Sequence, residues 1–158
     1  MCLECDGYSH EAAMQDLDLR IRVNGWTLIQ VEDGHTSFCY TVGLVENYDH
    51  PELVMMDLAV ELQPRYIAPL VHGITTRGRL PNQLLRAMGA QCLEVHDDHL
   101  RGDLFGRWFS RYGRCPQPGE VLQVLLPDEA YCECHGPSVR RLDGPGPTPR
   151  APGLNRAE

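Results

Sequence analysis

Four consecutive apolar residues, Leu53 to Met56, constrain the fold of this chain more than any other feature. Successive side chains of a β-strand point to opposite faces of the sheet, so a run that is apolar at every position needs cover on both faces. Such a run is typical of a central strand. It therefore predicts a sheet that has this strand in its interior.

Patterns on either side of this run predict the other elements of the fold. Residues 26–32 alternate between apolar and polar, and the Asp33-Gly34 pair that follows is a strong hairpin signal. On the returning strand, Phe38, Tyr40 and Val42 share one face. Helices are predicted for residues 9–24, 62–75 (with Pro69 kinking or splitting it), 81–88 and 98–113, and strands for residues 92–96 and 120–126. This order predicts an α+β fold, a single domain with a mainly antiparallel sheet flanked by helices.

Composition bounds the domain and its partners. The chain has 158 residues, a formal net charge of −8 and arginine as its only basic residue besides histidine. Residues 136–158 carry +2 of this charge, so residues 1–135 carry −10. That field repels nucleic acid and anionic membranes, and we expect neither as a main partner. An N-terminus without an apolar region, and the lack of a run near the ~20 apolar residues of a membrane span, favour the cytosol.

The last part of the chain differs from the rest in composition. Residues 136–158 contain five prolines and four glycines, with almost no large apolar side chains. Such a segment buries too little surface to offset the entropy lost on ordering. We therefore expect a folded domain over residues 1–135 and a disordered Pro/Gly/Arg-rich tail over residues 136–158.

Cysteines near both ends of the domain suggest a metal site. In a cytosolic protein, cysteine pairs are more often metal ligands than disulfides, and thiolates suit zinc. Two pairs could together hold one tetrahedral zinc ion, with a histidine as the substitute for one thiolate. The candidate ligands are Cys2, Cys5, Cys132, Cys134 and His135. The alternative is two unrelated pairs of reduced cysteines without a ligand.

A second candidate site lies around the loop before the central strand. His50 and Glu52 are two residues apart, and on a strand they would share one face, where they could form an acid–base pair or bind a metal. Tyr40 and Thr41 would supply hydroxyl groups from the preceding strand. The alternative is a turn at His50-Pro51 in which Glu52 accepts backbone N–H bonds.

A third cluster, His96-Asp97-Asp98-His99, also combines imidazoles with carboxylates. A metal site is one interpretation of it. The other is that Asp98 caps the helix predicted for residues 98–113, which explains the polar run without a metal.

Several short motifs resemble those of one protein family. They are Met1-Cys2-Leu3-Glu4-Cys5, Gly25-Trp26, residues 38–44 (FCYTVGL), residues 50–53 (HPEL) and residues 123–128 (QVLLPD). In order and spacing they resemble a bacterial family, domain of unknown function 4262, over roughly residues 1–128. The resemblance implies no activity, because the family has none established, and residues 131–135 are not part of its pattern.

Two functions follow from these features. The first is a zinc-stabilised cytosolic accessory or interaction module that binds an unknown protein partner. The alternative is a small-molecule-binding protein or metal-dependent enzyme with a pocket at Tyr40, His50 and Glu52. A pocket lined by those side chains would favour the alternative, and a flat surface there would favour the module.

Overall fold

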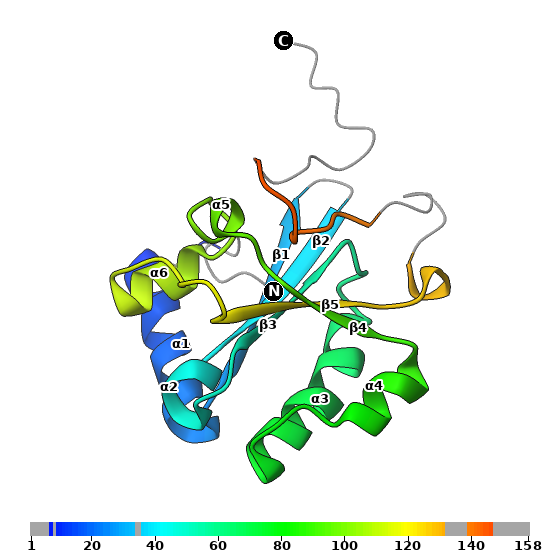
Figure 1. The fold of residues 1–158 in the computed structure, drawn as a ribbon. Helices are drawn as coiled ribbons and strands as arrows, with labels where there is room; N and C mark the ends of the chain where they lie inside the picture. Colours follow the sequence, from blue (N-terminus) through cyan, green and yellow to red (C-terminus); the bar gives the residue numbers. More distant parts are fainter. Residues whose placement is uncertain (1–6, 8, 34–35, 132–138, 147–158) are drawn as a thin grey trace.

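A five-stranded sheet forms the centre of the molecule (Figure 1). The computed structural model describes residues 7, 9–33, 36–131 and 139–146. The strands are β1 (Thr27–Asp33), β2 (Thr36–Val42), β3 (Glu52–Met56), β4 (Gln91–Glu94) and β5 (Val121–Leu125), in the order β1-β2-β3-β5-β4. The β3–β5 pair is parallel and the other pairs are antiparallel. The predicted α+β fold with a mainly antiparallel sheet is confirmed.

Helices cover both faces of this sheet. They are α1 (His10–Asn24), α2 (Leu44–Tyr48), α3 (Gln63–Arg77), α4 (Asn82–Met88), α5 (Asp97–Leu100) and α6 (Gly106–Tyr112), with a 3₁₀ turn at Asp128–Ala130. Figure 1 shows α1 and α6 grouped on one side of the molecule and α3 and α4 on the other. None of the helices in the described ranges is long and apolar enough to cross a membrane.

β3 lies between two hydrophobic cores. Val54 and Met56 belong to the core under α1 and α6, whereas Leu53 and Met55 belong to the core under α3. All four side chains are at most 1% exposed. The predicted central strand is therefore confirmed, and burying each such side chain stabilises the fold by about 1.5–3 kcal/mol.

Local signals in the sequence set the ends of α1. Ser9 accepts a hydrogen bond from the backbone N–H of Ala12, and Gly25 ends the helix with a φ of 84°. Positive φ strains other residues far more than glycine, and a helix commonly ends in this way. α1 thus begins and ends as predicted. α3, in contrast, continues through Pro69 as one helix.

The helix predicted for residues 98–113 is wrong as a single element. The structure has α5 and α6 instead, separated by a turn that contains Gly102. Glycine lowers helix stability by about 1 kcal/mol, which explains an interruption at this point of a periodic pattern. The cap of α5 is His96, whose Nδ1 accepts a hydrogen bond from the backbone N–H of Asp98.

Residues 139–146 also differ from the prediction, because they pack against the sheet. Leu142 is fully buried, and the backbone of Arg140 and Leu142 bonds to both ends of the Gln123 side-chain amide. Arg140 also forms a buried ion pair with Asp57 (Nη2–Oδ1 2.8 Å). Disorder was expected from composition, but a buried leucine, a buried ion pair and the bonds to Gln123 dock this short segment. Residues 136–138 and 147–158 lie outside the described residues.

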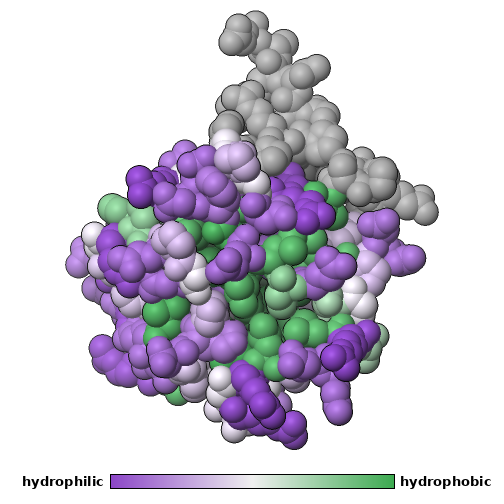
Figure 2. Space-filling view, in the orientation of Figure 1, coloured by the Kyte–Doolittle hydropathy of each residue, from purple (hydrophilic) through white to green (hydrophobic). Residues whose placement is uncertain are grey.

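The surface is mixed in character. Figure 2 shows hydrophobic side chains gathered in the middle of one face, where Figure 1 places strands of the sheet. Hydrophilic side chains surround this area. They belong to the outer sides of the helical groups and to the loops.

Candidate functional site

The carboxylate of Glu52 is the most highly connected polar group of the predicted site. Glu52 is the first residue of β3, and its side chain is 1% exposed. Both carboxylate oxygens accept hydrogen bonds, and the donors come from residues 41–45 and from α6. The donors are Thr41 Oγ1 (3.0 Å), Gly43 N (3.1 Å), Leu44 N (2.9 Å), Val45 N (3.5 Å) and Trp108 Nε1 (3.1 Å). Glu52 therefore joins the β2–α2 turn and α6 to the central strand.

Burial changes the acidity of this carboxyl. Loss of solvation raises the pKa of Glu52 from 4.5 to about 7, although the hydrogen bonds from Leu44, Trp108, Thr41 and Gly43 act in the opposite direction. The backbone must also come close at this point. A side chain at Gly43, whose φ is 115°, would place its Cβ 2.6 Å from the carbonyl oxygen of Gly25. The close approach at Gly43 is thus one between two backbone segments.

The other residues of this predicted site lie in different surroundings. Thr41 Oγ1 accepts from the backbone N–H of Leu53 and donates to Glu52. His50 Nδ1 donates to the carbonyl of Pro51 (2.8 Å), and no hydrogen bond or ion pair joins His50 to Glu52 among the described residues. The structure therefore brings Thr41 and Glu52 together but leaves His50 outside. These contacts match the alternative in which Glu52 accepts backbone bonds, and a catalytic role stays a prediction.

Tyr40 belongs to the core under α1 and α6. Its hydroxyl accepts a hydrogen bond from the backbone N–H of Arg107 (3.0 Å), and its ring packs edge-on against Phe105. Burial raises the pKa of Tyr40 to about 12, so the phenol is neutral at physiological pH. Tyr40 is the only one of the four predicted residues that borders the cleft described below.

The structure does not describe the predicted zinc ligands. Cys2, Cys5, Cys132, Cys134 and His135 lie outside the described residues. In the described ranges, no group of three or more histidine, cysteine, aspartate or glutamate side chains could hold a metal ion.

The His96–His99 cluster has other partners. His99 Nε2 donates to the carbonyl of Gly144 (2.8 Å), and Asp98 Oδ2 accepts from the backbone N–H of Gly146 (2.7 Å). These bonds attach residues 139–146 to α5. The structure thus gives the cluster a structural role that neither interpretation had foreseen.

A cleft of about 750 Å³ lies on the Tyr40 side of the sheet. Its walls come from one side of α1, from residues 103–110 and from β1 and β2. Phe38, Tyr40, Ile29 and Val31 form an apolar floor. The polar and charged side chains that border it are His10, Asp16, Arg20, Thr27, Gln30, Glu32, Asp103, Arg107 and Ser110.

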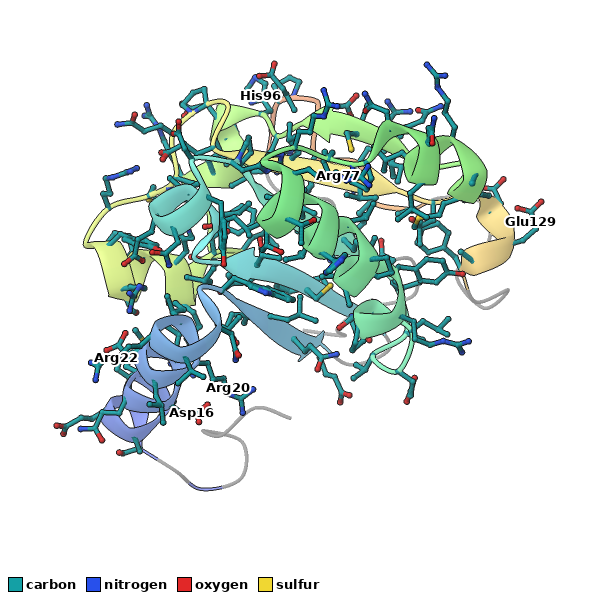
Figure 3. All side chains as sticks on the ribbon, turned by 90° about the horizontal axis from the view of Figure 1, so that it is seen from below. Asp16, Arg20, Arg22, Arg77, His96 and Glu129 are labelled. Carbon is teal, nitrogen blue, oxygen red and sulfur yellow. The ribbon has the colours of Figure 1, made fainter. Side chains whose placement is uncertain are left out.

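Some of the charged side chains around this cleft interact with each other. Arg20 Nε lies 2.8 Å from Asp16 Oδ2, one helical turn away on α1. Figure 3 shows both side chains on α1, at the end of the molecule opposite Glu129. Arg107 Nη1 lies 3.1 Å from His10 Nδ1, across the cleft between α6 and α1. The cleft thus combines an apolar floor with a charged rim.

Sequence reasoning did not identify this cleft. It is built from residues on α1, β1 and α6 that are far apart in the chain and form no motif. The sequence did contain one signal. The alternating pattern of β1 indicates a strand that is less completely covered than β3, whose residues are apolar on both faces.

Comparison with known proteins gives one match. The sequence model of a family described as "Domain of unknown function (DUF4262)" matches residues 20–131, in agreement with the resemblance of the motifs. No curated protein and no solved structure matches the chain.

Proposed function

This chain belongs to the DUF4262 family, whose description names no function, and on that premise we propose a function from the chain's own geometry. The protein is, on this proposal, a binding module whose ligand occupies the cleft between α1, β1 and α6. The observation that carries the proposal is the cleft itself. Its volume of about 750 Å³ falls in the range of ligand sites, and it joins an apolar floor to a few polar groups at the rim.

A catalytic site at Tyr40, His50 and Glu52 has less support. The oxygens of Glu52 are occupied by internal donors, and its side chain is buried. A general base must come within hydrogen-bond distance of the substrate proton, which these contacts prevent unless the core opens. Binding without chemistry therefore explains the arrangement better than a small enzyme does.

A fragment library screened by ¹H–¹⁵N NMR tests this proposal. Fragments should shift the amide signals of cleft residues in the wild-type protein. Gly106→Trp supplies a blocked cleft, because Gly106 borders the cleft and its added Cβ would meet open space. Gly144→Trp is the matched control, since Gly144 also has open space but does not border the cleft.

The expected result is binding to the wild type and to Gly144→Trp, and loss of the same shifts in Gly106→Trp. Fragment shifts that cluster at another surface, or a library without any cleft binder, would contradict the proposal.

We further propose, from the sequence, that a zinc ion stabilises the module. Its ligands would be Cys2, Cys5, Cys132 and Cys134, with His135 as a possible substitute. Thiolate ligands of this kind suit the reducing cytosol, which we propose as the location.

Metal analysis of protein purified without chelator or His-tag tests the zinc site. Near-stoichiometric zinc should be lost in both Cys2→Ser/Cys5→Ser and Cys132→Ser/Cys134→Ser. Loss in only one variant would separate the two pairs, and a metal-free wild type would exclude the site.

A further inference from the structure

β1 is an edge strand, and within the described part of the chain its outer side has no partner strand. It lies at the end of the sheet order and pairs with β2 over all seven of its residues. Among the described residues, no backbone hydrogen bond joins Thr27–Asp33 to any strand or loop other than β2. An edge of this length presents a row of N–H and C=O groups that can template another strand.

The cleft follows this edge. All six consecutive residues from Thr27 to Glu32 border it. A ligand that lay only on one face of the sheet would meet alternate residues, because neighbouring side chains point to opposite faces. Contact with every residue in turn is expected where a cleft runs along the rim of the strand, past its backbone.

We propose that the ligand of this cleft is an extended peptide segment of a partner protein, which pairs with β1 as a sixth strand. This inference rests on the function proposed above and specifies its ligand. Main-chain hydrogen bonds to β1 would supply affinity, and alternate side chains of the peptide would contact the apolar floor. Ile29 and Val31, on β1 itself, form the part of that floor nearest the edge, and their partners Tyr40 and Phe38 lie behind them on β2.

The length of β1 sets the size of the peptide. At about 3.3 Å per residue, a strand of this length spans about 23 Å and accommodates roughly seven residues. α1 and residues 103–110 form the wall of the cleft that flanks this edge.

Charge selects a basic peptide over an acidic one. The cleft is bordered by the carboxylates of Asp16, Glu32 and Asp103 and by the guanidinium groups of Arg20 and Arg107. Arg20 is itself paired with Asp16. The whole chain carries −8, so its long-range field attracts cations. A second copy of this chain carries the same negative charge and is therefore a poorer occupant than a basic segment.

The probe is the fluorescent peptide acetyl-Val-Arg-Val-Arg-Val-Arg-Val-amide, titrated by anisotropy and by ¹H–¹⁵N NMR. We expect saturable binding that shifts the amides of residues 27–32. The same peptide N-methylated at alternate residues, which keeps the side chains but removes N–H donors along one edge, should bind at least about tenfold more weakly. A peptide with glutamate in place of arginine should bind more weakly still.

Two pairs of protein variants complete the test. Glu32→Lys should weaken binding of the basic peptide by roughly threefold, as expected for an exposed charge pair. Glu129→Lys makes the same change of charge on an exposed residue outside the cleft and should bind like the wild type. Gly106→Trp should lose binding, and Gly144→Trp should keep it.

The outcomes separate this inference from the function on which it rests. If fragments bind in the cleft but the basic peptide does not, or if N-methylation has no effect, strand addition is wrong and the binding module stands. If neither fragments nor peptides bind in the cleft, both are wrong. A dimer in light scattering whose dissociation exposes the β1 amides would show that a second copy is the occupant, and would also overturn the inference.

Discussion

Two groups of charged side chains differ in their surroundings. The carboxylates at the two ends of β3 are buried and bonded within the protein, whereas those around the cleft are exposed. Glu52 begins β3 and Asp57 follows it, and the two are 1% and 3% exposed. Internal donors hold both, and those of Asp57 come from Arg140. Around the cleft, Asp16 and Arg20 remain 38% and 57% exposed.

This difference teaches which polar residues of the chain are available to a ligand. A buried carboxylate whose oxygens are occupied stabilises the fold, since removing it leaves its donors without partners. An exposed ion pair contributes little to stability and can exchange its partner for a ligand. Glu52, which the sequence suggests as a catalytic residue, is thus a buried carboxylate that stabilises the fold. The cleft, in contrast, is bordered by exposed charged side chains that a ligand can reach.

The largest effect is expected for Glu52→Ala. This change leaves the N–H groups of Leu44 and Trp108 and the other donors buried without an acceptor, and should lower the free energy of unfolding by about 3–5 kcal/mol. Urea denaturation measures it. Glu61→Ala, which removes an exposed carboxylate, is the control and should change stability by less than about 0.5 kcal/mol. If Glu52→Ala lost as little stability as the control, the buried carboxylate would stabilise the fold no more than an exposed one does.

Arg140→Ala should cost about 3 kcal/mol, because it leaves the buried carboxylate of Asp57 without its guanidinium partner. The exposed neighbour Arg141, which pairs with Asp143, provides the control. Arg141→Ala should unfold within about 0.5 kcal/mol of the wild type. Equal stability of the two variants in thermal or urea unfolding would mean that the buried ion pair adds nothing to the docking of residues 139–146.

Most of the fold followed from the sequence because its signals are local. The apolar run of β3, the alternation of β1 and β2 and the caps of α1 each depend on a few neighbouring residues. The family resemblance was confirmed for the same reason. The predictions that missed involve tertiary contacts or local propensities that compete with the apolar pattern. The docking of Leu142 and the interruption between α5 and α6 arise from partners distant in the chain or from competing propensities.

The candidate sites divide in the same way. The spacing of His50 and Glu52 led to the prediction of a shared site. Spacing does not reveal that Trp108 and the turn at Gly43 fill the bonding positions of the Glu52 carboxylate, and the catalytic role of the pair stays a prediction. The cleft could not be predicted, because α1, β1 and α6 meet only through the fold.

The titration of Glu52 should make stability depend on pH. In the unfolded chain this carboxyl titrates near its ordinary pKa of 4.5, and in the folded protein near 7. Between these values the folded state keeps a proton that the unfolded state has lost, so its contribution to stability is present below pH 4.5 and falls as the pH rises towards 7. At about 1.4 kcal/mol per unit, the free energy of unfolding should decrease by up to about 3 kcal/mol across this window.

Urea denaturation of the wild type and of Glu52→Gln at several pH values between 4.5 and 7.5 measures this contribution. Glutamine cannot titrate, so the difference in slope between the two proteins isolates Glu52 from the other carboxylates. Parallel slopes would show that the carboxyl has the same pKa in both states, and would remove burial as the dominant influence on it.

The smallest effect on stability is expected at the rim of the cleft. Arg20 and Asp16 form an exposed pair one helical turn apart, and such pairs stabilise a helix by about 0.3–0.5 kcal/mol. Arg20→Ala should therefore unfold almost like the wild type, and like Arg101→Ala, which removes the equivalent exposed pair with Asp97 on α5. Only Arg20 borders the cleft. Because its removal leaves Asp16 unpaired beside the ligand, Arg20→Ala should bind the basic peptide more tightly, whereas Arg101→Ala should leave its affinity unchanged. A stability loss above about 1 kcal/mol would place Arg20 among the groups that hold the fold. Weaker binding of the basic peptide would contradict the role assigned to the charged rim of the cleft.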